Sequence, residues 1–259
     1  MKKFKKVVPA LCALLVSAVM LGSSTYAWFS MNTQVKATGM EIKAESKSQF
    51  LQIRAGEDAF SDTEAQIDAT AKNKSKSVRP TSAVKALSEN GDSVTELDTT
   101  VAAKDIKWVE AFSNNPNASD KNGKYTDVTE KITGSDTTNN VYALINTFKV
   151  RMNPTAGVTE GTNMSVTSVT IQSSNNTAND VMKKAVRVLF VCGDKWSVWT
   201  ADGAKVSSNT NILADTVTTD ATTISVYIYF DGEDSLTTTN NAATLSTDGY
   251  KVEFVLGVA

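Results

Sequence analysis

The segment that follows the apolar run TTISVYIYF carries three acidic residues within a few positions. Asp231, Glu233 and Asp234 lie in a stretch whose composition is typical of a turn. Carboxylate oxygens gathered in this way are the hard ligands that Ca²⁺ prefers in proteins. The spacing matches no calcium loop, however, and a solvated turn accounts for three acids without any ligand. We therefore predict no metal site and no cofactor at this cluster.

The chain contains no histidine, and this absence excludes several classes of enzyme. A Ser-His-Asp triad, a Cys-His dyad and a His-ligated zinc site all require an imidazole ring. Paired carboxylates serve glycosidases, but nothing in the sequence marks such a pair or a sugar cleft. Cys192 ends the apolar run AVRVLFVC, which is typical of a buried thiol rather than a reactive one. We predict that the protein is not an enzyme and has no catalytic residues.

Two tryptophans beside an acidic residue raise the alternative of a glycan-binding surface. Trp196 and Trp199 follow Asp194, and indole rings stack on sugar faces. The two positions have opposite parity on a regular strand, so at most one of the rings faces outward. At least one of them is more simply explained as a core residue.

The N-terminus has the three parts of an export signal. Lysines precede an apolar run from Val7 to Leu21, and Thr25-Tyr26-Ala27 ends a small, polar region. The apolar run is shorter than the roughly 20 residues that a spanning helix needs. We therefore predict that residues 1–27 are a signal peptide, cleaved between Ala27 and Trp28, rather than a retained membrane anchor, so that no stable membrane span remains after cleavage.

Charge argues against a nucleic-acid partner. The formal net charge of the whole chain is −2. It becomes more negative when the lysines of the signal peptide are removed. A mildly acidic surface offers no electrostatic attraction to phosphates. We expect no nucleic-acid binding.

Most of the remaining chain reads as short strands separated by Asn, Asp, Gly, Ser and Thr. The clearest alternation of apolar residues falls in 142–152, 224–230 and 250–256, and a hairpin is expected with turns near 193–195 and 202–203. Few prolines and no alternation of strands with helices indicate an all-β fold, an antiparallel jelly-roll-like β-sandwich with short helical or loop insertions. We expect residues 28–259 to form one such domain, with 56–135 as irregular insertions that build no second core.

A strand pattern begins directly after the expected cleavage site. Its alternate positions share one face: Met31, Thr33, Val35 and Ala37. After Gly39 the apolar residues Met40, Ile42 and Ala44 occupy the other set of alternate positions, which indicates a bulge or a bend. A strand in this place either pairs within its own subunit, as any first strand does, or is free to pair with another chain.

The same N-terminal region carries a resemblance to a known family. GSSTYAWFSMNTQVKATGMEIKA resembles the start of the TasA/camelysin-type proteins of Gram-positive bacteria, whose mature chains begin at an Ala-aromatic junction, here Ala27-Trp28-Phe29. A strand and a Gly-apolar-x-apolar step follow, here Gly39 to Ile42. RPTSAV, VYALINTFKVRM, KAVRVLFVCGD and VYIYFDGED are similar to segments of clostridial members. The resemblance spans most of the mature chain, and the N-terminal junction is its most specific part.

The resemblance implies a function outside the cell. Members are exported with a signal peptide cut by a dedicated signal peptidase, SipW, and the family fold is a jelly-roll sandwich. TasA forms extracellular filaments of the biofilm matrix, in which the N-terminal strand of one subunit completes a sheet of the next. Carried over by position, the donor strand would be residues 28–37, with Met31, Thr33, Val35 and Ala37 as its assembly face. The partners would be further copies of the chain and, during export, the signal peptidase.

Other functions stay open at this point. Camelysin is described as a surface metalloprotease, but a chain without histidine cannot supply the two His ligands of that zinc motif. A monomeric cell-envelope protein, an S-layer-associated protein or an adhesin would fit the Thr- and Asn-rich strands equally well. All these readings place the protein in the extracellular matrix or at the cell surface.

Overall fold

The computed structural model describes a little over half of the chain in separate stretches. These are residues 41–46, 51–56, 60, 66–70, 79–110, 125–133, 142–155, 157–173, 181–237, 241 and 250–259. The expected signal peptide, the cleavage site between Ala27 and Trp28 and the assembly residues Met31, Thr33, Val35 and Ala37 lie outside these ranges. Within them, no helix has the length and apolar character needed to cross a membrane.

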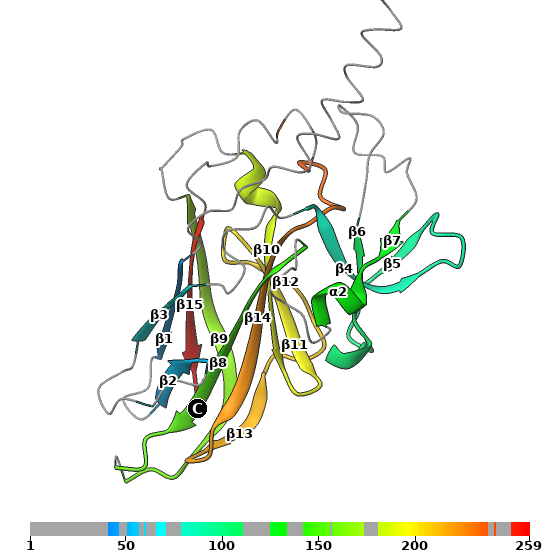
Figure 1. Ribbon diagram of the computed structural model, residues 1–259. Helices are drawn as coiled ribbons and strands as arrows, with labels where there is room; N and C mark the ends of the chain where they lie inside the picture. The colour runs from blue at the N-terminus through cyan, green and yellow to red at the C-terminus, as the bar shows by residue number, and fades with distance from the viewer. Residues whose placement is uncertain are drawn as a thin grey trace, which may run out of the picture.

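The strands in the part of the chain that the structure describes form three sheets (Figure 1). The five-stranded sheet has the order β13 (Ala214–Thr218), β9 (Glu160–Ser173), β15 (Tyr250–Gly257), β1 (Glu41–Ser46) and β3 (Gln66–Thr70). The six-stranded sheet has the order β12 (Lys205–Ser208), β11 (Lys195–Thr200), β10 (Val186–Cys192), β14 (Thr222–Phe230), β8 (Leu144–Met152) and β2 (Leu51–Ala55). The four-stranded sheet has the order β5 (Val94–Glu96), β4 (Thr81–Leu87), β6 (Lys107–Glu110) and β7 (Thr126–Asp127).

The strands of the described residues pair in an antiparallel manner with one exception. β1 lies beside β15 in parallel, with Ile42 opposite Val252 and Ala44 opposite Phe254. The described residues include the short helical elements η1 (Ala103–Asp105), α2 (Thr129–Thr133) and η2 (Val181–Ala185). The predicted all-β antiparallel sandwich with short helical insertions is confirmed.

The main core lies between the five- and six-stranded sheets. Alternate residues of β8, β14 and β15 point into it, as period-2 patterning requires; the buried set includes Leu144, Phe148, Val150, Met152, Ile224, Val226, Ile228, Phe230, Tyr250, Val252, Phe254 and Leu256. The ring of Phe254 on β15 lies 5.3 Å from that of Phe148 and 5.0 Å from that of Phe190, both on the facing sheet. Edge-to-face contacts of this kind add to the stabilisation from apolar burial.

A second apolar cluster covers the other face of the six-stranded sheet. Leu189, Trp196 and Tyr229 of that sheet pack against Trp108 of β6 and Ile132 of α2. The expectation that 56–135 holds irregular insertions without a core is therefore wrong for its described parts. Of these, β3 belongs to the five-stranded sheet, and β4 to β7 build a third layer (Figure 1). Three of its strands, β5, β6 and β7, have only three, four and two residues, so their sequences carry little periodicity.

The expected hairpin is confirmed in its place and its turns. β10 and β11 pair through a turn at Gly193-Asp194, and Gly193 has φ +59°. The next turn holds Gly203, with φ +76°, where an added Cβ would lie 2.8 Å from the carbonyl oxygen of Val169 on β9. Both positions favour glycine because they use the left-handed region, and Gly203 in addition permits a close approach between the two main sheets.

Candidate functional site

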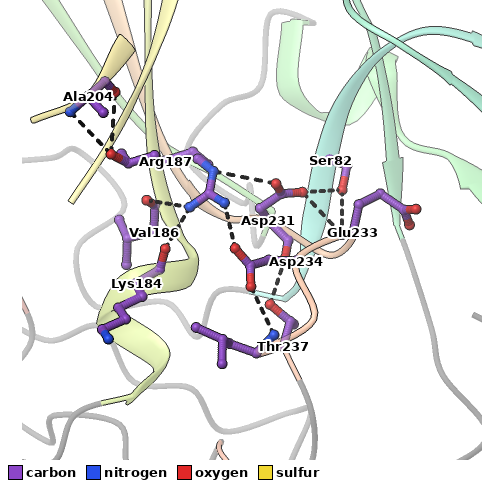
Figure 2. A network of polar contacts seen from close by, with 11 residues as sticks. Ser82, Lys184, Val186, Arg187, Ala204, Asp231, Glu233, Asp234 and Thr237 are labelled. Carbon is purple, nitrogen blue, oxygen red and sulfur yellow. Dashed lines mark hydrogen bonds and ion pairs between the residues drawn. The ribbon is translucent and has the colours of Figure 1, made fainter. Parts of the chain in front are cut away.

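A network of charged side chains lies where three segments of the chain meet. Arg187 follows Val186, the first residue of β10, Asp231 follows the last residue of β14, and Ser82 belongs to β4 of the third layer (Figure 2). Backbone bonds fix the turn after β14, since Asp231 N donates to Ala185 O at 2.9 Å and Gly232 N donates to Thr81 O at 3.3 Å. The turn thereby connects the six-stranded sheet to the third layer.

Arg187 is the centre of this network. Its Nη2 donates to Asp234 Oδ2 at 2.5 Å, and its Nε lies 3.5 Å from Asp231 Oδ2. Its Nη1 donates to the carbonyl oxygens of Lys184 at 2.7 Å and Val186 at 3.2 Å (Figure 2). Only 12% of the Arg187 side chain is exposed. Two carboxylates and two carbonyls therefore take the place of the water that this guanidinium loses on burial.

Asp231 joins Arg187 to the third layer. Its Oδ1 accepts hydrogen bonds from Ser82 Oγ at 2.7 Å and from Glu233 N at 3.1 Å (Figure 2). Burial raises the pKa of Asp231 above its ordinary value, although Arg187 and the Ser82 hydroxyl both favour the charged form. An ionised Asp231 is consequently stable in the fold only while its cation and its donors stay in place.

The acid cluster expected from the sequence is thus placed differently from the solvated turn that we predicted. Asp231 and Asp234 are mostly buried, with 21% and 15% of their side chains exposed, and both are ion-paired. Glu233 is exposed. The prediction of a solvated turn is wrong for Asp231 and Asp234, because Arg187 and Ser82 approach from distant segments. Among the described residues, no group of three or more acidic, cysteine or histidine side chains is arranged to hold a metal ion.

Sequence reasoning missed Arg187 and Ser82. A charged residue inside the apolar run AVRVLFVC was a signal of burial with a partner. Ser82 gave no comparable signal, because its role depends on a contact with a residue far away in the chain.

The tryptophan pair does not form a joint stacking surface. Trp196 is fully buried, and its Nε1 donates to Val101 O at 2.8 Å. Trp199 is partly buried against the main core, and its Nε1 donates to Ser197 Oγ at 3.0 Å. The predicted difference in parity is confirmed, and Trp196 is a core residue.

Cys192 is a buried thiol, as its apolar run indicated. The residue is 8% exposed and forms no disulfide. Burial raises the pKa of Cys192, and Lys195 lowers it to a smaller extent. A thiol in this state is a poor nucleophile.

A pocket opens beside the charge network, between the third layer and the six-stranded sheet. It has a volume of about 170 Å³ and takes its walls from β4, β5, β11 and β12, with Arg187, Tyr229 and Asp231 also lining it. Val206 of β12 belongs to this wall and is 58% exposed, the only large hydrophobic residue so exposed in the part of the chain that the structure describes.

The ends of the sheets are the other candidate sites. In the described part of the chain, β13 and β3 end the five-stranded sheet, and β12 and β2 end the six-stranded sheet. A strand at an edge presents backbone N–H and C=O groups to any further strand that can reach it.

No protein-family model, curated protein or solved structure matches the chain.

Proposed function

We propose that the protein is a secreted structural subunit of extracellular biofilm-matrix filaments, assembled by exchange of its N-terminal strand. The observation that carries the proposal is the sequence directly after the expected cleavage site, where Met31, Thr33, Val35 and Ala37 alternate with polar positions. The resemblance of this region to TasA/camelysin-type proteins agrees with it. The all-β sandwich supplies sheet edges of the kind that a donated strand requires.

Removal of the signal peptide would act as the assembly switch. While residues 1–27 are attached, the strand at 28–37 is held at the export machinery and cannot reach a neighbouring subunit. After cleavage between Ala27 and Trp28 it is free to add to a sheet edge, where backbone hydrogen bonds give affinity and alternate side chains fill pockets. Met31, Val35 and Ala37 are suitable apolar residues for that role.

In this proposal the protein is a structural subunit and not an enzyme. The chain lacks the histidines of the zinc proteases. The described charge network is satisfied within the protein and joins two layers of the fold. Its chemistry is that of a structural ion-pair cluster.

Electron microscopy of the processed chain tests the proposal. A chain of residues 28–259, released from a fusion partner by a protease that leaves Trp28 as the first residue, is expected to form long regular fibres in negative stain. The same chain with a folded protein still attached to Trp28 is the matched control and should remain as single particles. Uniform small particles in both samples would contradict the proposal and favour a monomeric envelope protein or adhesin.

A further inference from the structure

The pocket beside the charge network has an apolar wall that the described residues leave partly uncovered. Val84 and Val198 are buried at 2% and 5% exposure, whereas Val206 on the same wall is 58% exposed. The pairing of β12 with β11 shifts between Ser207 and Lys205, so Val206 is the extra residue of a β-bulge. A bulge changes the direction of a side chain. This one places an exposed valine at the pocket.

The pocket suits one uncharged aliphatic side chain. Its volume of about 170 Å³ is below the roughly 300 Å³ at which pockets for whole small molecules begin. Several polar residues of the lining already have partners within the protein, namely Ser82, Arg187, Ser207, Asp231 and Glu233. An aliphatic group leaves these interactions intact. It also gains from contact with Val206, because burial of apolar surface is favourable.

Two sheet edges flank the same pocket. Within the described residues, β5 pairs only with β4 and β12 pairs only with β11. Ser207 Oγ donates to Leu97 O at 3.3 Å, which holds the two edges beside each other. A segment that passes these edges with alternate side chains directed at the pocket has the geometry of strand addition. The occupant is therefore an extended polypeptide whose alternate residues are apolar, as they are in residues 28–37.

A subunit cannot place its own Val35 in this pocket. Val35 precedes Glu41, where β1 begins, by six residues, which span at most about 21 Å. β1 lies against β2 at one end of the six-stranded sheet, and β12 forms the other end within the described residues. Five strand spacings of about 4.8 Å separate these ends by roughly 24 Å, and the pocket lies on the face of the sheet turned away from β1 (Figure 1). A Val35 side chain that occupies this pocket therefore comes from another copy of the chain.

We propose that this pocket receives the Val35 side chain of a neighbouring copy, whose residues 28–37 lie extended past β5 and β12. The inference rests on the proposed exchange of the N-terminal strand and names the surface that accepts it. Val35 packs on Val206, while Gln34 and Lys36 face away from the pocket because a strand alternates its two faces. A contact between two different surfaces of the same chain builds a filament when it does not close into a ring.

Binding of the isolated strand tests this surface without any filament. The probe is a synthetic peptide of residues 28–37 with a dye at its C-terminus, and the acceptor is the chain with a folded protein attached to Trp28. Fluorescence anisotropy should show saturable binding. The Val35→Asp peptide should bind at least about tenfold more weakly, because an unpaired carboxylate in an apolar pocket costs more than valine burial gains. The Gln34→Asp peptide should bind within about twofold of the parental peptide, because its new charge faces away from the pocket.

Variants of the acceptor locate the binding site. Val206→Asp should weaken the parental peptide at least about tenfold, with a nearly unchanged melting midpoint because Val206 is exposed in the subunit. Thr216→Asp, at an exposed position of the edge strand β13, is the matched control and should leave binding unchanged. The Val35→Asp peptide should bind Val206→Lys at least about threefold more tightly than it binds the parental chain, because the two new charges attract.

Absence of saturable binding, equal binding of the Val35→Asp peptide or failure of Val206→Lys to restore it would overturn the proposal. A loss of binding with Thr216→Asp in place of Val206→Asp would overturn it as well. Binding at Val206 without fibres from the processed chain would support this surface and contradict the filament function. Fibres from the processed chain without binding at Val206 would support the filament function and overturn this surface.

Discussion

Arg187 shows how a single residue connects two layers of this protein. It is mostly buried at the start of β10, and its partners Asp231 and Asp234 lie in the turn that also contacts β4. The cost of taking three charges out of water is offset only because each has a close partner. Removing one member should therefore be far more harmful than removing an exposed ion pair.

Replacement of Arg187 by methionine should lower the free energy of unfolding by about 3–5 kcal/mol at pH 7, because it leaves two buried carboxylates without a cation. The pKa of Asp231, already raised by burial, would rise further without Arg187. A carboxyl group whose pKa is higher in the folded state than in the unfolded state stabilises the fold when it binds a proton. The variant should therefore regain stability as the pH falls from 7 to 5.

Denaturant unfolding at the two pH values measures this effect. In the Arg187→Met background, the further change Asp231→Asn removes the titrating group and should abolish much of the recovery at pH 5. An Arg187→Met variant with unchanged stability at pH 7 would show that the network does not contribute to folding as the structure indicates.

At the residue scale, the sequence predicted the pattern of burial better than the pattern of charge pairing. The alternation in β8, β14 and β15 correctly indicated which residues are buried, because a period of two assigns each residue to a face. The acids at 231–234 were found, but their environment was misread. No local signal links a turn at 231 to a serine at 82 or an arginine at 187.

At the scale of elements, the third layer is the feature that most changes the view of the fold. Trp108 of β6 is 2% exposed, and its ring lies 5.5 Å from that of Tyr227 and 5.1 Å from that of Tyr229 on β14. Trp196 Nε1, on β11 of the six-stranded sheet, also donates a buried hydrogen bond to Val101 O. The layer is thus attached to the central sheet by ring packing and by buried hydrogen bonds.

The change Trp108→Ala should destabilise the protein by about 3–5 kcal/mol, the usual cost of removing a large buried aromatic side chain. Lys107→Ala is the control, because Lys107 is exposed on the same strand and its removal should change stability by less than about 0.5 kcal/mol. Chemical denaturation followed by circular dichroism gives both values. A loss below about 1 kcal/mol for Trp108→Ala would mean that the layer is a surface insertion after all.

Which strands pair with one another was harder to predict from the sequence than where strands occur. The hairpin of β10 and β11 was predictable, since its turn lies between two adjacent apolar runs. The parallel pairing of β1 with β15 was not, because these strands come from opposite ends of the chain and parallel neighbours need a long connection. The short strands β5 and β7 lack enough residues for an alternation to show.

At the scale of the whole molecule, the proposal is that a sandwich with open sheet edges becomes a filament subunit when its N-terminal strand is released. Val35 is the residue of that strand best suited to test this. Burying a valine side chain contributes about 1.5–3 kcal/mol, and an unpaired carboxylate in the same place costs more than this gain. Gln34 has the opposite parity, so it is the matched position for the same new charge.

The most direct measurement is the yield of filaments from Val35→Asp and Gln34→Asp chains that begin at Trp28, counted by electron microscopy beside the melting midpoint of the unassembled subunits. The account predicts normal filaments from Gln34→Asp, few or none from Val35→Asp, and nearly equal melting midpoints for both. Filaments from Val35→Asp at the parental yield, together with a lowered melting midpoint, would show that the strand belongs to its own subunit and would contradict the account.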